Sequence, residues 1–152
     1  MVSDEQINAK YKILRVITII LLVGGPLAYF EVYRFVSGPG TLPLRPNDLL
    51  FYILLGLSLF QGIFIPIFQR ISVHKVDPSK LVRGTILDLA QAQVIVTMAF
   101  IESIYIYGLA IFFVTGSGAR LPYFYAIAIV YSIIYWPSQS RFTELVRKLE
   151  AT

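Results

Sequence analysis

Four long apolar stretches, separated by short charged segments, set the pattern of this chain. No Asp, Glu, Lys or Arg lies between Asp48 and Arg70 or between Arg120 and Arg141. The only such residue between Arg15 and Arg34 is Glu31, and the only one between Asp88 and Arg120 is Glu102. An apolar stretch of about 18 or more residues is long enough to cross the hydrocarbon core of a bilayer as a helix. The pattern therefore predicts an all-α, four-span transmembrane bundle in one integral membrane domain, with spans at about 14–36, 49–72, 90–115 and 120–138.

Lys and Arg residues are distributed unevenly between the segments that flank these spans. Ten of them fall in the N-terminal segment, the segment after the second span and the C-terminal tail. The other side of the predicted bundle has only Arg34, Arg45 and Arg120. Since cytoplasmic segments are enriched in Lys and Arg, both termini and the middle loop, residues 73–89, are expected in the cytoplasm.

The middle loop and the tail each contain a shorter helical pattern. In the loop, Asp77 and Pro78 are suited to start a helix. The segment LVRGTILDLAQAQ that follows predicts either an amphipathic surface helix or an extension of the third span, with Gly84 as a joint. The tail, residues 139–152, is amphipathic, and its apolar face suits an interfacial helix or a docking surface for a partner.

Two segments resemble each other within the chain. FVSGPGTLP at 35–43 is similar to FVTGSGARLP at 113–122, and both fall at a predicted outer turn. This similarity favours two parallel helical hairpins, as in a duplicated membrane protein. The other interpretation is that outer turns simply favour Gly and Pro.

The composition supports membrane insertion and excludes several classes of chemistry. Charged residues make up 14% of the chain, against about 25% in soluble domains, and the mean hydropathy is +0.71. There is no Cys for a disulfide or a thiolate site. The pI near 9.4 reflects the cations that flank the spans, so no nucleic-acid partner is expected. We expect a multi-pass protein of a prokaryotic cytoplasmic (inner) membrane, and no enzyme, because no span brings together His, Cys or paired carboxylates.

Glu102 is the one ionisable side chain deep within a predicted span. A charge there costs roughly 2.5–3.5 kcal/mol on insertion scales, so the carboxyl group should face the bundle, be protonated or hold a cation. Glu102 and Gln61 each lie about eight residues, or ~12 Å, from the same end of their antiparallel spans. They are therefore expected at one depth. Ser103 and Tyr107, four residues apart, lie on one helix face beside Glu102.

The sequence ESIYIYGL, together with Gln61, resembles the ion-binding hairpin of the c subunits of rotary ATP synthases. The resemblance covers residues 56–115 and includes the basic segment DPSKLVRG between the two helices. Sodium-carrying members of that family pair the Glu with a Ser directly after it, a Tyr five residues after it and a Gln on the preceding helix. The resemblance implies that Glu102, Ser103, Tyr107 and Gln61 bind H⁺ or Na⁺.

These observations lead to two hypotheses about function. In the first, Glu102, Gln61, Ser103 and Tyr107 bind or relay H⁺ or Na⁺, and no other cofactor is expected. In the second, the chain is a non-catalytic accessory, structural or assembly subunit, and Glu102 is a protonated carboxyl that joins two helices. Both give the protein the lipid bilayer as a partner, together with further copies of itself or other membrane subunits.

Overall fold

The computed structural model describes residues 2–36, 48–74, 83–116 and 118–151, and within these ranges it contains helices and no strand. The elements are α1 (Asp4–Ile19), the π-helical turn η1 (Ile20–Gly24), α2 (Gly25–Val36), α3 (Asp48–His74), α4 (Arg83–Thr115), the 3₁₀ turn η3 (Gly118–Arg120), α5 (Leu121–Ile134) and α6 (Gln139–Glu150). The predicted all-α class is confirmed. Three helical segments are long and apolar enough to cross a membrane, or four if the bent pair α5 and α6 counts as one span.

The first span is one helical segment, Asp4–Val36, in which η1 joins α1 to α2. A capping box between Ser3 and Gln6 starts α1 about ten residues before the predicted span. Pro26 has no amide N–H, so the Leu22 carbonyl cannot receive its usual α-helical bond. The Gly25 amide donates instead to Ile20, five residues back. The π-helical turn thus accommodates the proline within a continuous span.

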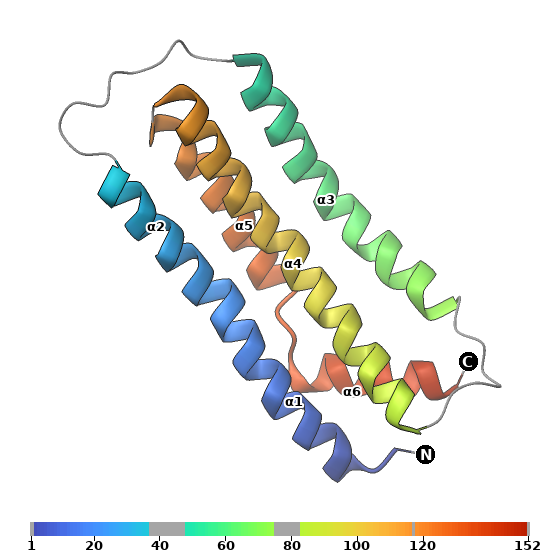
Figure 1. The fold of residues 1–152 in the computed structure, drawn as a ribbon. Helices are drawn as coiled ribbons and strands as arrows, with labels where there is room; N and C mark the ends of the chain where they lie inside the picture. Colours follow the sequence, from blue (N-terminus) through green and yellow to red (C-terminus); the bar gives the residue numbers. More distant parts are fainter. Residues whose placement is uncertain (1, 37–47, 75–82, 117, 152) are drawn as a thin grey trace.

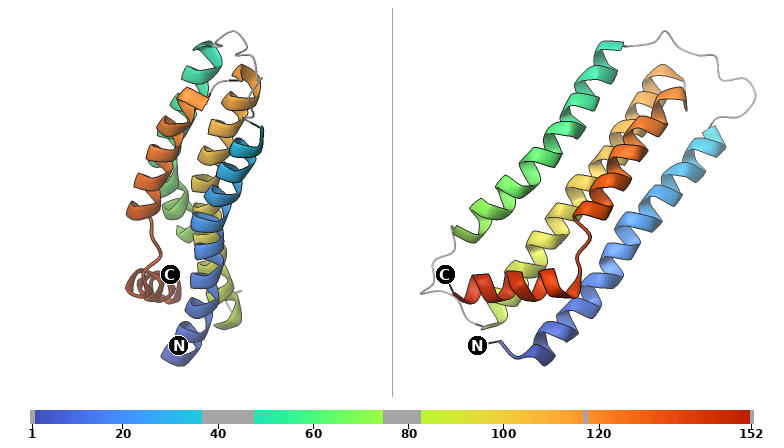
Figure 2. Two further views of the ribbon diagram at one scale, coloured as in Figure 1. Left: turned by 90° about the vertical axis from the view of Figure 1, so that its left-hand side faces the viewer. Right: turned by 180° about the vertical axis from the view of Figure 1, so that it is seen from behind.

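Helix α4 lies at the centre of the bundle. It lies between α2 and α3 in both the front and the rear view (Figures 1 and 2). Helix α5 packs along α4 on the side that faces away from the viewer in Figure 1. Half of the most apolar 18-residue window of α4 is buried, against 17% for each of the other two long spans. Because α4 separates α2 from α3, the first two spans do not form a packed hairpin like that of α4 and α5. The structure therefore does not show two equivalent hairpins, and residues 37–43 and 117 of the internal similarity lie outside the described residues.

Close contact between α4 and α5 depends on small and aromatic residues. A Cβ at Gly108 would lie 3.2 Å from both Leu121 Cδ2 and Phe124 Cβ, so α5 approaches the backbone of α4 closely there. Ile101, Ile104 and Phe124 are fully buried in the same core. This packing fixes the face of α4 that is turned toward α5, and with it the directions of the remaining faces.

Helix α5 ends at Ile134, four residues before the predicted end of the fourth span. Pro137 cannot continue a helix and restricts the residue before it. Arg141 Nη1 donates to the Ile134 carbonyl, one of the acceptors that the helix end leaves open. The chain then bends by 66° into α6.

The apolar face of α6 is buried within the chain, which corrects both interpretations of the tail. Phe142, Val146 and Leu149 pack with Ile7 and Leu14 of α1 and with the first turns of α4 in a second core. This face is therefore covered mainly by α1 and α4 of the same chain. Sequence periodicity shows that a face is apolar, but it does not show which surface covers it.

The beginning of α4 distinguishes between the two predictions for the middle loop. Helix α4 runs without a break from Arg83 into the third span, so this segment is an extension of the span. Asp77 and Pro78 lie outside the described residues. The side of the membrane on which the termini lie stays a prediction.

Candidate functional site

Glu102 lies in the middle of α4 and faces the first turns of α2. A Cβ built on Gly25 would overlap Glu102 Oε1 and lie 2.8 Å from its Cδ, so a side chain at position 25 would force the carboxyl group to move. The hydroxyl of Tyr29, one helical turn further along α2, hydrogen-bonds to the carboxyl group. Gly25 and Tyr29 therefore form the surface that receives Glu102.

The carboxyl group is only partly satisfied by hydrogen bonds. Its Oε2 is buried and has no hydrogen-bond partner among the described residues. Tyr105 and Tyr125 complete its electrostatic surroundings, with ring centroids 4.9 Å apart. In the described parts of the chain, no Lys or Arg forms an ion pair with Glu102. An uncompensated negative charge at this depth is costly, so these surroundings favour the protonated, neutral carboxyl.

Gln61 meets Ser103 and Tyr107 on a different side of α4. Gln61 Nε2 donates to Ser103 Oγ at 2.8 Å and to Tyr107 Oη at 3.1 Å. Ser103 Oγ donates in turn to the Phe100 carbonyl at 2.7 Å. Gln61 Oε1 is buried and has no partner in the part of the chain that the structure describes. These bonds join α3 to α4 at the depth that the sequence predicts.

The structure thus brings together three of the four predicted site residues and directs the fourth elsewhere. Successive residues of an α-helix point about 100° apart. Ser103 consequently faces α3, whereas Glu102 faces α2. No hydrogen bond joins Glu102 to Gln61 among the described residues, so a single chain does not show the four residues as one ligand shell.

The sequence reasoning missed Gly25 and Tyr29. Tyr29 lies near one end of its predicted span, where an aromatic residue is ordinarily explained by the membrane interface. A signal was present, since Gly25 and Tyr29 are four residues apart and so share a helix face. Which of the two neighbouring glycines, Gly24 or Gly25, faces α4 depends on the π-helical turn, and that turn is not visible in the hydrophobic pattern.

Comparison with protein-family models, curated proteins and solved structures finds no match to this chain. Among the described residues, no three His, Cys, Asp or Glu side chains gather as metal ligands would. The chemistry of the site follows from one carboxyl group, the hydroxyl of Tyr29, the neighbouring phenols of Tyr105 and Tyr125 and their apolar surroundings.

Proposed function

We propose that this chain is a four-span membrane protein that binds a proton at Glu102, in the contact between α2 and α4. The observation that carries the proposal is the buried, unpartnered Oε2 of an intramembrane carboxyl group held against Gly25. Helix α5 provides the fourth crossing. The distribution of Lys and Arg supports cytoplasmic termini and placement in a prokaryotic cytoplasmic membrane.

A proton suits this site better than a sodium ion. Sodium is a hard cation that requires several oxygen ligands, whereas a proton requires one basic atom and a dry environment. Among the described residues, the side chains that interact with the Glu102 carboxyl group are the phenols of Tyr29, Tyr105 and Tyr125, and Tyr29 alone hydrogen-bonds to it. The hydroxyls of Ser103 and Tyr107 are engaged with Gln61 on another side of α4.

Tyr29 can hydrogen-bond to Glu102 in both the protonated and the ionised state of the carboxyl group. Its hydroxyl donates to the carboxyl group, and such a bond is stronger when the acceptor is ionised. Loss of the proton would leave one charge-assisted bond and a carboxylate beside the backbone of Gly25. The ionised state would favour separation of α2 from α4 and entry of water, which connects proton binding to the packing of these helices.

Carbodiimide labelling tests the proposal on the full-length protein in lipid nanodiscs. Dicyclohexylcarbodiimide reacts with protonated carboxyl groups in apolar surroundings, and peptide mapping identifies the labelled residue. We expect labelling of Glu102 that decreases as pH rises and that Na⁺ at constant pH does not change. Glu31 is an internal control, because it lies exposed beside Arg34 at 3.3 Å and should stay unlabelled.

Two results would contradict proton binding at Glu102. One is an absence of labelling at every pH between 5 and 9, and the other is protection by Na⁺, which would assign the site to a metal cation. Proton flux into proteoliposomes, followed with an entrapped pH dye, tests relay separately. If the wild-type protein conducts protons and the equally stable Glu102→Gln variant does not, Glu102 carries the proton. If neither protein conducts protons and the variant is less stable than wild type, the carboxyl group only joins helices.

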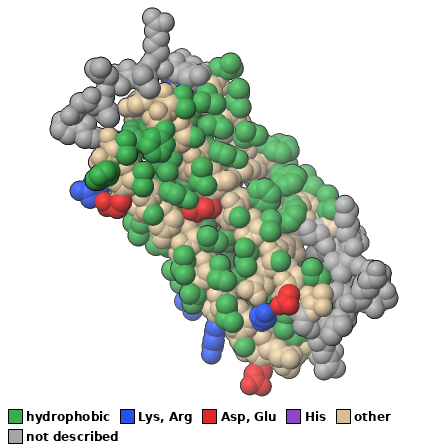
Figure 3. Space-filling model, viewed as in Figure 1, with side chains coloured by type: hydrophobic (Ala, Val, Ile, Leu, Met, Phe, Trp, Pro, Cys, Tyr) green, Lys and Arg blue, Asp and Glu red, His purple; other side chains and the backbone are tan. Residues whose placement is uncertain are grey.

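A role as an accessory or structural subunit is the second candidate, and the position of Glu102 favours it. The residue is only half-buried within one chain. On the face shown in Figure 3, an acidic group lies among hydrophobic side chains, away from the charged ends. A helix from another copy or another subunit would cover it. Chemical cross-linking in native membranes, followed by mass measurement of the complex, distinguishes a homo-oligomer, a hetero-complex and a lone chain.

A further inference from the structure

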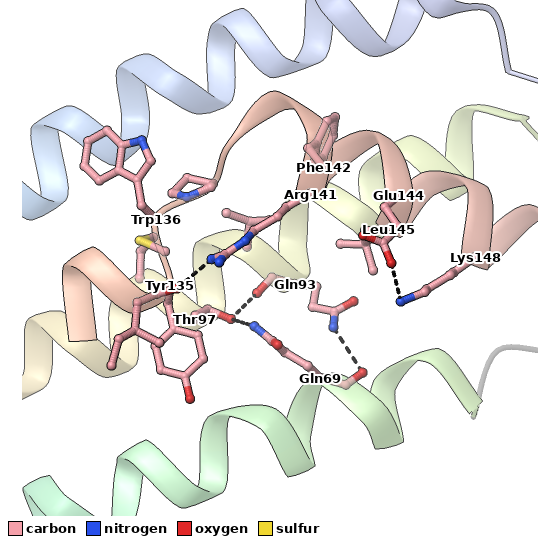
Figure 4. A pocket seen from close by; sticks show the side chains of 14 residues that line it. Gln69, Gln93, Thr97, Tyr135, Trp136, Arg141, Phe142, Glu144, Leu145 and Lys148 are labelled. Atoms are coloured by element: carbon pink, nitrogen blue, oxygen red, sulfur yellow. Dashed lines mark hydrogen bonds and ion pairs between the residues drawn. The ribbon is translucent and has the colours of Figure 1, made fainter. Parts of the chain in front are cut away.

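A cavity of about 390 Å³ lies at the end of the bundle where α6 packs, and Glu102 is not among the residues that line it (Figure 4). It opens between α3, α4, the bend after α5 and the first turns of α6. Its size falls within the roughly 300–1,000 Å³ typical of ligand sites. Nothing in the proposed proton site uses it.

One wall of the cavity is built from amide side chains. Gln69 Nε2 donates to Thr97 Oγ1 at 3.1 Å, and Gln93 Nε2 donates to the Gln69 carbonyl at 3.0 Å. Each amide nitrogen has two N–H donors. These bonds use one donor of each residue, so each keeps a second donor at a cavity wall. The bonds also fix both side chains, which reduces the entropy that a ligand would have to overcome.

The opposite wall carries cations on α6. Arg141 Nη1 donates to the Ile134 carbonyl, which holds the guanidinium at the cavity and leaves its other N–H groups for a ligand. Lys148 also lines the cavity and pairs with Glu144 at 2.8 Å. Two cations and one carboxylate give this wall a net charge of about one positive unit.

The position of the cavity matches the interface of a bilayer. Apolar α5 ends beside it, charged α6 begins there, and Tyr135 and Trp136 line it, as aromatic residues do at the level of lipid headgroups. Val94 and Met98 form its apolar inner part. A ligand that fits these walls has a phosphate at one end and hydrocarbon at the other.

We propose that this cavity binds the headgroup of a phospholipid with a single net negative charge. Arg141 and Lys148 contact the phosphate, the free N–H donors of Gln69 and Gln93 contact its oxygens or the headgroup hydroxyls, and Val94 and Met98 contact the first acyl methylenes. Guanidinium groups bind phosphate through paired N–H donors. A zwitterionic headgroup fits less well, because its ammonium would lie against a wall that is already positive.

Lipid retention by the purified full-length protein tests this proposal. Native mass spectrometry after equal exposure to phosphatidylglycerol and phosphatidylcholine should show phosphatidylglycerol retained at least about tenfold more, because the choline ammonium adds a positive charge beside Arg141 and Lys148. Both lipids carry the phosphate, but choline also offers no hydroxyl to Gln69 and Gln93. Trp136 is the only tryptophan of the chain and lines the cavity. Phosphatidylglycerol brominated near the ester end should therefore quench its fluorescence at lower mole fractions than brominated phosphatidylcholine.

Three variants connect the binding to this cavity. Lys148→Gln and Gln93→Leu should each reduce retention of phosphatidylglycerol without changing that of phosphatidylcholine, and Arg141→Gln should reduce it most. Because Arg141 also caps α5, its substitution disturbs the end of that helix as well as the cavity. The result for Arg141→Gln is therefore interpreted only together with those for Lys148→Gln and Gln93→Leu. Lys12→Gln is the matched control, an exposed cation of α1 outside the cavity, and should have no effect.

Three outcomes would overturn the proposal. Equal retention of the two lipids would show that charge is not recognised. Displacement of the lipid by millimolar inorganic phosphate, with Trp136 fluorescence responding to phosphate alone, would assign the site to a free anion. Retention that survives all three variants would place the lipid elsewhere on the protein.

Discussion

The backbone of Gly25 and the carboxyl group of Glu102 are in direct contact across the interface of α2 and α4. A Cβ on Gly25 would come within 2.0 Å of Glu102 Oε1, whereas a Cβ on the preceding residue, Gly24, would meet no atom within 4 Å. Gly24 and Gly25 are neighbours in the sequence, but only Gly25 is in contact with Glu102. The contact places the one deep carboxyl group against the bare backbone of a glycine, where an added side chain would displace it.

The contact predicts a large difference between two alanine substitutions. Gly25→Ala should destabilise the protein by about 1–3 kcal/mol, as overpacking usually does, whereas Gly24→Ala should be near neutral. Thermal unfolding in detergent, followed by size-exclusion chromatography, measures both. The double variant Gly25→Ala with Glu102→Ala should regain most of the loss, because the clashing atoms are gone. Equal effects of the two single substitutions would show that Glu102 does not pack on Gly25.

A second pair of glycines tests the contact of α3 with α5. A Cβ on Gly62 would lie 2.2 Å from Tyr131 Oη, whereas Gly56 has open space around it. Gly62→Ala should therefore loosen α3 from the bundle and lower the unfolding temperature, and Gly56→Ala should not. Tyr131→Ala in the Gly62→Ala background should relieve the clash. A stable Gly62→Ala protein would indicate that Tyr131 lies elsewhere.

Replacement of Gln61 should have a small and local effect. Gln61→Leu removes the bonds to Ser103 and Tyr107, and interhelical bonds of this kind contribute on average about 0.6 kcal/mol in membranes. Carbodiimide labelling of Glu102 should stay unchanged, because Gln61 contacts another side of α4. A large change in labelling would show that Gln61 and Glu102 act as one site, as the resemblance to c subunits implies.

The two ends of the chain are joined by Arg147. Its guanidinium donates to the Val2 carbonyl at 3.0 Å, to Asp4 at 2.6 Å and to Glu150 at 2.8 Å. Arg147→Gln should increase amide hydrogen exchange in residues 2–7 and in α6 without changing exchange in the middle of α4. Lys12→Gln is again the control, since Lys12 is an exposed cation at the middle of α1. Unchanged exchange in both segments would contradict the assigned role.

The same junction should loosen in acid. Hydrogen bonds from Arg147 and from the Val2 amide lower the pKa of Glu150 below its ordinary value of 4.5. The carboxylate is therefore more stable in the folded protein, so its stabilising contribution is complete above pH 4.5 and is lost as pH falls through the lowered pKa. The protection factors of amides in α6, which correct for the slower intrinsic exchange in acid, should fall below about pH 4.5 when measured from pH 6 to pH 3.

A Glu150→Gln variant separates this effect from general acid unfolding. It lacks the titrating group, so exchange in its α6 should already be faster at pH 6 and should depend less on pH. Glu144, whose pKa Lys148 also lowers, lies exposed on α6, and Glu144→Gln should leave the pH dependence of exchange in place. An identical pH profile in wild type and Glu150→Gln would assign the transition to other groups.

The sequence predicted the depth of the polar residues better than their partners. Gln61 and Ser103 meet, and Gln93 contacts Gln69 at the end of the same two helices, as equal depth along antiparallel spans requires. Depth follows from counting residues along helices of known rise. The partner of Glu102 did not follow, because a rotation of α4 by one residue, about 100°, changes which neighbouring helix its side chain meets.

The sequence alone determined the helical class, the existence of long apolar spans and the presence of one deep carboxyl group, because each depends on local composition and length. Only the tertiary structure decided that α4 is central, that the apolar face of α6 is buried within the chain, and that Glu102 lies against Gly25 and Tyr29. These features depend on which helix faces pack together. Nearly every face of the spans is apolar, so the hydrophobic pattern does not select among the packings, whereas close contacts at glycine and bends at proline do.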